Sequence, residues 1–217
     1  MISKKSFALF AELEANNNKA WFDKHRDDIH EYAVVPVAST LEAATKALAS
    51  TNVPMIGGAN TLSRINRDIR FAKNKAPYKT SVSGLMTPDG SKCGDEGVVY
   101  LQIDQHGGHM SAGYYNVEPV VLKRIRDKIV ERPEEFRKVI EELDEAGFEL
   151  IRENPLTGMP RGYSQYAKEW FADSLKLKSF LVRTRISDQI WIEGTIVPHL
   201  VDHTLKCSSL IRFGQSR

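Results

Sequence analysis

Residues 97–115 read Gly-Val-Val-Tyr-Leu-Gln-Ile-Asp-Gln-His-Gly-Gly-His-Met-Ser-Ala-Gly-Tyr-Tyr, and they carry the clearest structural signal in the chain. Residues 97–104 are typical of a well-buried strand, because β-branched, aliphatic and aromatic side chains dominate them. Gly107 and Gly108 then provide a tight turn, and residues 109–115 return as a second strand. A parallel pair would need a connection of about a dozen residues, so these two strands must pair antiparallel.

Two further segments have the character of strands. Residues 81–87 suit a strand and are followed by the turn signal Pro88-Asp89-Gly90. Residues 180–186, with the sequence Phe-Leu-Val-Arg-Thr-Arg-Ile, predict another strand. Together with residues 97–115 they indicate an antiparallel meander.

The regions before and after these strands predict helices. Apolar side chains recur at helical spacing from Ser6, a plausible N-cap, to residues 16–18, and Asn18 can cap the helix that follows. Pro36 fits the first turn of a third helix, which we expect to end at about Ser50. Three more predicted helices begin at Glu118-Pro119, at Pro133 and at about Ser187, the last reaching about Cys207.

Helices that bracket an antiparallel sheet define an α+β fold rather than a doubly wound one. A chain of 217 residues is long for one domain and short for two. No internal repeat, low-complexity tract or linker divides the sequence. We therefore expect a single α+β domain over residues 1–217.

The composition is that of an ordinary globular protein, with 41% apolar and 27% charged residues. No window approaches the roughly 18 consecutive apolar residues of a membrane span, and the first apolar run stops at Glu12, too early for a secretory signal. Cys93 and Cys207 lack a redox or metal-binding spacing, which suits free thiols in a reducing compartment. We expect a soluble, cytoplasmic protein with no membrane partner.

The charges are unevenly distributed along the chain. The formal net charge is only +2, less than dedicated nucleic-acid-binding domains usually carry. Residues 64–80, Arg-Ile-Asn-Arg-Asp-Ile-Arg-Phe-Ala-Lys-Asn-Lys-Ala-Pro-Tyr-Lys-Thr, nevertheless hold six positive charges against the single carboxylate of Asp68. Like charges at this density repel one another unless an anion offsets them. The six cations of this basic segment are Arg64, Arg67, Arg70, Lys73, Lys75 and Lys79.

We interpret the basic segment as a candidate site for an anion, because guanidinium groups bind carboxylate and phosphate through paired hydrogen bonds. In this hypothesis the six cations line a cleft, Asp68 orients a guanidinium and Tyr78 closes over the ligand. We expect a short helix or turn over residues 64–68, then a brief strand and a loop over residues 74–77. The alternative is that the arginines form ion pairs with carboxylates of neighbouring helices.

The basic segment also resembles the pattern RI-x-RD-x-RF-x-K-x-K-x-PYKT of a bacterial and fungal family, domain of unknown function 2461. The resemblance extends over nearly the whole chain, although Gly162-Tyr163 continues as Ser-Gln-Tyr-Ala where the family often has Gly-aromatic-x-x-x-His-Pro. It implies an α+β fold and a shared feature over residues 64–80, and it supplies no reaction, ligand or catalytic residue. Three further similar segments are Asn16-Asn17-Asn18-x-x-Trp21-Phe22, Gly113-Tyr114-Tyr115-x-x-Glu118-Pro119 and Leu175-Lys176-Leu177-Lys178-Ser179-Phe180.

Histidines occur at two places where they could bind a ligand. His199, His203 and Cys207 fall at helical spacing, where two such side chains can share a metal ion. The glutamate of an HExxH motif is missing, so we favour a polar helix edge over a metal site. His106 and His109 flank the glycine turn, and we expect solvated side chains there. No phosphate-cradling loop or nucleophile motif is present, and we expect no cofactor.

Tyr114 and Tyr115 are adjacent in a strand, so one ring points inward and the other outward, where it can line a cleft. Our first functional hypothesis is a protein that binds a small anionic ligand. The second is an enzyme of unknown reaction in the same cleft, although an aspartate among cations stays ionised and is poorly suited to proton transfer. The third is a protein-interaction module or a weak binder of nucleic acid. The sequence does not indicate an oligomeric state.

Overall fold

A four-stranded antiparallel sheet forms the centre of the computed structural model, which describes residues 2–216. The strand order is β1-β2-β3-β4, and each strand pairs antiparallel with the next. The predicted α+β fold and its antiparallel meander are confirmed. The strands are β1 (Ser81–Met86), β2 (Val98–Asp104), β3 (His109–Tyr114) and β4 (Phe180–Arg185).

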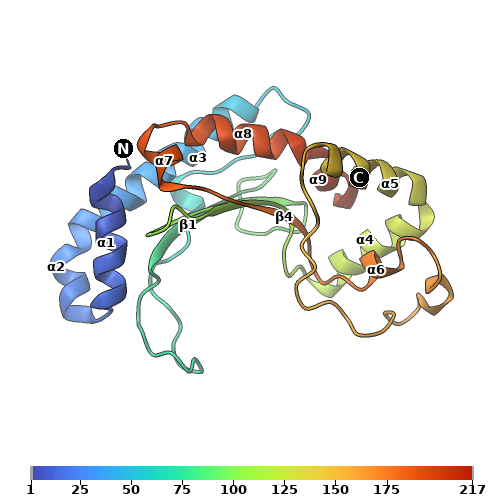
Figure 1. Ribbon diagram of the computed structural model, residues 1–217, viewed down its shortest axis with the longest axis horizontal. Coiled ribbons are helices and arrows are strands. Elements are labelled where there is room, and N and C mark those ends of the chain that lie inside the picture. The colour runs from blue at the N-terminus through green and yellow to red at the C-terminus, as the bar shows by residue number, and fades with distance from the viewer. Residues whose placement is uncertain (1, 217) are drawn as a thin grey trace.

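Helices cover one face of this sheet and both of its ends (Figure 1). Helices α3, α8 and α9 lie over one face, with α3 against β1 and with α8 and α9 against β3. Within residues 2–216, no helix is long and apolar enough to cross a bilayer. The helices are α1 (Lys4–Ala15), α2 (Lys19–Ile29), α3 (Val35–Leu48), α4 (Pro119–Glu131), α5 (Pro133–Glu145), α6 (Ala172–Leu175), α7 (Asp188–Ile192), α8 (Ile196–Lys206) and α9 (Ser208–Gly214).

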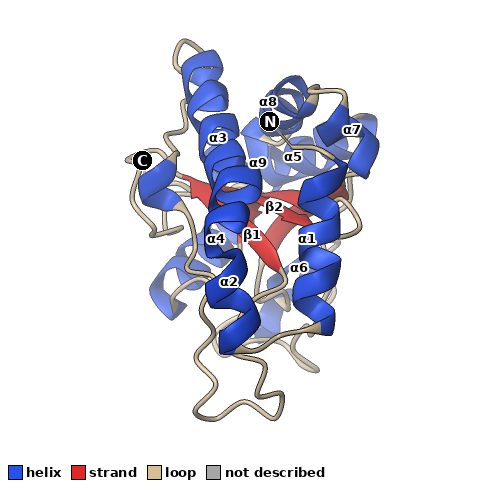
Figure 2. Cartoon of the chain, turned by 90° about the vertical axis from the view of Figure 1, so that its left-hand side faces the viewer, coloured by secondary structure: helices blue, strands red, loops and turns tan. Residues whose placement is uncertain are grey.

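The burial of alternate residues distinguishes the two faces of the sheet in β2, whereas β3 is buried at every position except His109. In β2, Val99, Leu101 and Ile103 are fully buried beneath the helices. Tyr100, Gln102 and Asp104 alternate with them and are only partly buried. Successive side chains of a strand point to opposite faces, so these three lie on the other face of the sheet. We call the side away from α3 and α8 the open face. Figure 2 shows the sheet in cross-section, with α3 and α8 on one side of it.

The first predicted helix start is wrong by three residues. Helix α1 begins at Lys4 and its N-cap is Ser3, which has an extended backbone. Ser6 lies inside the first turn, where its hydroxyl accepts a hydrogen bond from the Ser3 N–H at 3.1 Å. The expected cap at Asn18 is confirmed, since its side-chain oxygen accepts a hydrogen bond from the Trp21 N–H at 3.0 Å.

The third predicted helix is confirmed, with Pro36 in its first turn, but no break separates it from the second helix. Helix α2 passes through a π-helical turn, His30–Val34, directly into α3. In an α-helix, the ring of Pro36 would clash with the carbonyl four residues earlier. A π-helical turn widens the spacing, and the Val35 N–H accordingly bonds to the His30 carbonyl, five residues before it. The wider turn lets the chain stay helical up to and beyond the proline.

The single helix predicted over residues 187–207 is also wrong. The segment forms α7 and α8, separated at Gly194, and α9 follows directly. Gly194 has a φ of +73°, a left-handed conformation that glycine adopts at little cost because it lacks a Cβ atom. The apolar pattern continues across this break, so the pattern alone does not reveal it.

His203 in α8 is buried without a hydrogen-bond partner. Its side chain is 1% exposed and contacts the ring of Phe148 at 5.1 Å between centroids. Neither ring nitrogen has a partner among residues 2–216. Burial lowers the pKa of His203 from 6.5 to about 4, while the carboxylate of Asp202 opposes the shift and Lys206 adds to it. The ring is therefore neutral in the folded protein at physiological pH.

We expect His203 to make the fold sensitive to mild acid. Between pH 6.5 and pH 4 the unfolded chain binds a proton at this ring that the folded chain does not, so stability falls with pH by about 3 kcal/mol over this window. In the His203→Leu variant, urea unfolding between pH 7.5 and pH 4 should show a correspondingly smaller loss. His199→Leu, on the exposed side of the same helix, is the control. An equal loss of unfolding free energy between pH 7.5 and pH 4 in the wild type and in His203→Leu would contradict the prediction.

Gly113 is required by the way β3 approaches β4. Its φ is +127°, and a Cβ atom there would lie 2.2 Å from the Phe180 carbonyl oxygen. Gly147 has a φ of +75°, but a Cβ atom there would meet nothing within 4 Å. The two glycines therefore separate the cost of the backbone conformation from the cost of a steric clash.

Gly113→Ala should destabilise the protein by about 3 kcal/mol or more, since it combines backbone strain with displacement of a neighbouring strand. Gly147→Ala should cost only about 1 kcal/mol, because strain alone acts there. Chemical unfolding of the two variants measures the difference. Similar losses would show that β3 can shift away from β4 without penalty.

Candidate functional site

The basic segment forms a hairpin that projects from the β1 edge of the sheet, on its open side (Figures 1 and 2). Asn66 and Tyr78 form an antiparallel bridge. Next to it, the Arg67 N–H donates to the Pro77 carbonyl and the Lys79 N–H donates to the Ile65 carbonyl, both at 2.8 Å. The helix or turn expected over residues 64–68 is therefore wrong. The segment is extended because its two arms satisfy each other's backbone groups.

Tyr78 anchors the hairpin to the N-terminal helices. Its backbone N–H donates to the Asn17 side-chain oxygen at 3.0 Å, and the Asn17 amide nitrogen donates to the Tyr78 carbonyl at 2.9 Å. Its ring stacks on Phe22 with 3.8 Å between centroids and is 7% exposed. A ring this buried is not free to close over a ligand, which corrects the role we expected for Tyr78. Two of the segments that carry the family resemblance thus contact each other here.

Three cations of the hairpin have partners within the hairpin itself. Arg70 pairs with Asp68 at 2.7 Å, and this hydrogen-bonded contact lowers the pKa of Asp68. The guanidinium of Arg67 donates to the Ala76 carbonyl at 3.0 Å, and the Lys75 ammonium donates to the Ile69 carbonyl at 3.0 Å. Asp68 therefore pairs with a guanidinium of its own hairpin.

The other three cations of the hairpin lack such partners in the described part of the chain. Among residues 2–216, no ion pair or side-chain hydrogen bond involves Arg64, Lys73 or Lys79. Of the arginines in the segment, Arg70 pairs with a carboxylate, and that carboxylate belongs to the hairpin and not to a neighbouring helix. The six cations therefore lie together on the hairpin. The structure has a cavity on the open face of the sheet, and none of the six cations is among the residues that line it.

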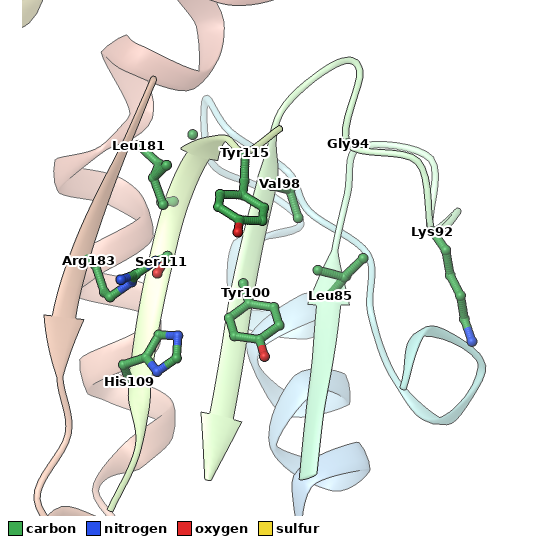
Figure 3. A pocket seen from close by; sticks show the side chains of 12 residues that line it. Leu85, Lys92, Gly94, Val98, Tyr100, His109, Ser111, Tyr115, Leu181 and Arg183 are labelled. Carbon is green, nitrogen blue, oxygen red and sulfur yellow. The ribbon is translucent and has the colours of Figure 1, made fainter. Parts of the chain in front are cut away.

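This cavity has a volume of about 340 Å³ and spans all four strands (Figure 3). Its centre is one cross-strand row in which Tyr100 is the register partner of Ser111, and Ser111 is the partner of Arg183. Leu85 extends the row on β1. The rest of the lining comprises Lys92, Gly94, Val98, His109, Ala112, Gly113, Tyr115 and Leu181.

We did not predict this row from the sequence. The period of two in each strand places alternate residues on one face, which would have been the available signal. Combining the strands, however, requires their register, which no local pattern in the chain gives. His109, expected to be solvated, is half-buried against the cavity, whereas His106 is exposed. Tyr114 is fully buried and Tyr115 is 61% exposed beside the cavity, so one inward and one outward ring are confirmed.

Ser111 places an unsatisfied hydroxyl on the cavity floor. The residue is 5% exposed, and its Oγ has no hydrogen-bond partner among residues 2–216. Burying a hydroxyl without a partner costs about 1–3 kcal/mol. Gly113 lines the cavity on the same face of β3, between its cross-strand partners Val98 and Leu181. A ligand in the cavity can supply the missing hydrogen bond.

Arg183 brings a positive charge to the cavity, and no carboxylate is among the residues that line it. Lys92 also lines it, but its ammonium donates to the Leu62 carbonyl at 2.7 Å and points away from the other lining side chains (Figure 3). Burial raises the pKa of Tyr100, and burial together with the charge of Arg183 lowers the pKa of His109, so both rings are neutral at pH 7. Arg183 uses Nη1 to bind Glu153 at 3.0 Å, and its remaining nitrogens have no partner within residues 2–216.

A hydrogen-bonded chain fixes the Tyr100 side of the cavity. The Tyr100 hydroxyl donates to the Gln102 side-chain oxygen at 2.7 Å, and the Gln102 amide donates to Asp104 at 3.2 Å. The Tyr100 oxygen is thus directed by its own neighbours along β2. With its proton engaged, it offers lone pairs rather than a donor to the cavity.

A second cavity of about 450 Å³ adjoins the first, and the two share Tyr115 and Leu181 in their linings. The backbone beside Tyr115 is fixed, since the Asn116 N–H donates to the Ser179 hydroxyl at 3.0 Å. One cation, Lys178, and one carboxylate, Glu153, line this second cavity. Tyr115 therefore presents its ring at the junction of two hollows.

The residues weighed as a metal site do not come together. His199 is exposed, while His203 and Cys207 are buried, and burial raises the pKa of the Cys207 thiol to about 12. A thiol with so high a pKa is a poor metal ligand, because thiolates are the ligating form. Within the described part of the chain, no group of three His, Cys, Asp or Glu side chains could hold a metal ion.

Comparison with known proteins places these features in a family. A model of the family described as conserved hypothetical protein (DUF2461) matches residues 5–213. No curated protein and no solved structure matches the chain. The match includes the hairpin, its anchor at Asn17 and the whole sheet. Because it spans nearly the entire sequence, the resemblance seen in the motifs is confirmed, and the chain belongs to the DUF2461 family of conserved hypothetical proteins.

Proposed function

We propose that this protein binds a small phosphate- or carboxylate-bearing ligand in the cavity of the open face. The unpartnered hydroxyl of Ser111 carries the proposal, because a buried donor without an acceptor calls for a bound group. Arg183, its cross-strand neighbour, supplies the charge that selects an anion. Both groups lie on strands, and such rigid elements lower the entropy cost of binding.

Each lining group has a distinct role in this proposal. Arg183 donates from the nitrogens that Glu153 leaves available, and a guanidinium can bind two oxygens of one phosphate. Ser111 donates its hydroxyl proton to the same anion. His109, neutral at pH 7, donates from one ring nitrogen. The Tyr115 ring covers a flat or apolar part of the ligand.

The basic segment belongs to the same proposal. Arg64, Lys73 and Lys79 belong to the hairpin, which lies on the open side of the sheet (Figure 1), and their field attracts anions to this side of the molecule. The other charged residues of the segment hold the hairpin in shape through contacts within it. In this scheme the hairpin attracts the ligand and the sheet binds it.

Ser111→Ala should weaken binding about tenfold without destabilising the free protein. The substitution removes the hydrogen bond to the ligand, worth about 1–2 kcal/mol, and also removes an unsatisfied polar group. Isothermal titration with inorganic pyrophosphate, citrate and UMP measures the affinity, and thermal unfolding measures stability. Ser209→Ala is the matched control, because Ser209 is also buried with an unpartnered hydroxyl but lies on α9. Unchanged affinity in Ser111→Ala, or no binding of any probe, would refute the proposal.

Arg183→Gln should lower the affinity for the same probes by about 10- to 100-fold, since charge-assisted hydrogen bonds contribute roughly twice as much as neutral ones. Stability should change little, because the Arg183–Glu153 pair is partly exposed. Arg132→Gln, which breaks an exposed pair with Glu135, is the control. If both variants bind as the wild type does, the anion is held elsewhere.

A further inference from the structure

Phe71 is 95% exposed at the tip of the basic hairpin. An aromatic side chain in this position leaves a large apolar surface in water and contacts little of the protein. Its immediate neighbour Arg70 lies with its guanidinium 6.0 Å from the ring centroid. The tip therefore combines a free aromatic face with positive charge.

The tip is a built structure that presents Phe71 in a defined place. The Arg67 guanidinium and the Lys75 ammonium each bond to backbone carbonyls across the hairpin. The Ala76 N–H is bound by the Asn74 side-chain oxygen at 2.8 Å. Together with the anchor at Tyr78, these contacts fix both ends of the arm that carries Phe71.

A second exposed aromatic residue, Tyr115, lies on the open face between the two cavities. Arg183 lines the first cavity beside it, and Lys178 lines the second together with Glu153, the partner of Arg183. The hairpin and the open face lie on the same side of the sheet, away from α3 and α8 (Figures 1 and 2). One extended ligand can therefore contact both.

We propose that the natural ligand is a single strand of nucleic acid. This inference rests on the proposed function and names the class of ligand that the cavity binds. One nucleotide occupies the first cavity, with its phosphate at Arg183 and Ser111 and its base on Tyr115. The strand continues towards the hairpin, where Arg64, Lys73 and Lys79 neutralise phosphates and Phe71 stacks on a second base.

Single strands suit this surface because their bases are free to stack on protein rings and their backbone carries a charge at each nucleotide. A duplex hides its base faces. An acidic peptide offers carboxylates without flat rings, and a flat bilayer that reached Phe71 would not enter the cavities on the sheet. The net charge of +2 is no obstacle, since exposed charges beyond about 8 Å are screened at physiological salt.

Fluorescence anisotropy with labelled twelve-residue oligo(dT) and oligo(U), and competition by UMP, test the inference. The oligonucleotide should bind at least tenfold more tightly than UMP. Its affinity should fall with salt, with a slope near −0.7 for each phosphate contacted. Phe71→Ser should lower oligonucleotide affinity about 5- to 100-fold, as removal of one stacking ring does, and should leave UMP binding unchanged. Val120→Ser on α4, which removes another exposed apolar side chain, should change neither.

Lys73→Ala should reduce the salt slope by about 0.7, the contribution of one phosphate, whereas Lys138→Ala on α5, an exposed lysine far from the hairpin, should not. Unchanged thermal unfolding of each variant shows that it is folded. The inference is overturned if the oligonucleotide binds no better than UMP, if Phe71→Ser has no effect, or if only phosphatidylglycerol vesicles bind. In those cases UMP binding that depends on Ser111 would leave the proposed function standing. Failure of UMP, pyrophosphate and citrate alike would remove both.

Discussion

Helices cover the sheet on one side only, and this one-sided covering determines what the other side can do. Apolar residues at alternate positions must face α3, α8 and α9, so the intervening positions can carry polar side chains, although several of them are also buried. Antiparallel pairing then aligns those intervening residues in rows across the strands. The row of Tyr100, Ser111 and Arg183 exists because three strands are held in one register by the core residues behind them.

The same constraint explains how a modest cavity can be well defined. Strand pairing, and not a flexible loop, holds the hydroxyl of Ser111, the guanidinium of Arg183 and the rings of Tyr100 and His109. Their backbone positions should therefore change little when a ligand binds. Gly113 lines the cavity as well, and its lack of a side chain lets β3 approach β4 closely, since a Cβ atom there would meet the Phe180 carbonyl. The pairing of β3 with β4 that aligns Ser111 with Arg183 therefore depends on this glycine.

The sequence predicted what local signals determine. The glycine turn at residues 107–108 gave the meander, and Asn18 gave a helix start, because both depend on near neighbours. Pro36 marked the start of the third helix correctly, but the π-helical turn that joins it to the second helix, like the left-handed Gly194, leaves little trace in an apolar pattern. The cavity and the burial of Tyr78 were missed for a different reason: strand register and the contact with Phe22 are set by segments distant in the chain.

The anchor of the hairpin has a consequence for the order in which the chain folds. Asn17 and Tyr78 are separated by 61 residues, so their two hydrogen bonds close a long loop and cannot precede the docking of the N-terminal helices. Before that docking, the positively charged hairpin has only its own cross-arm contacts and the edge of β1 to hold it. Its charge opposes aggregation while the apolar strands beside it are still unpaired, much as gatekeeper residues do.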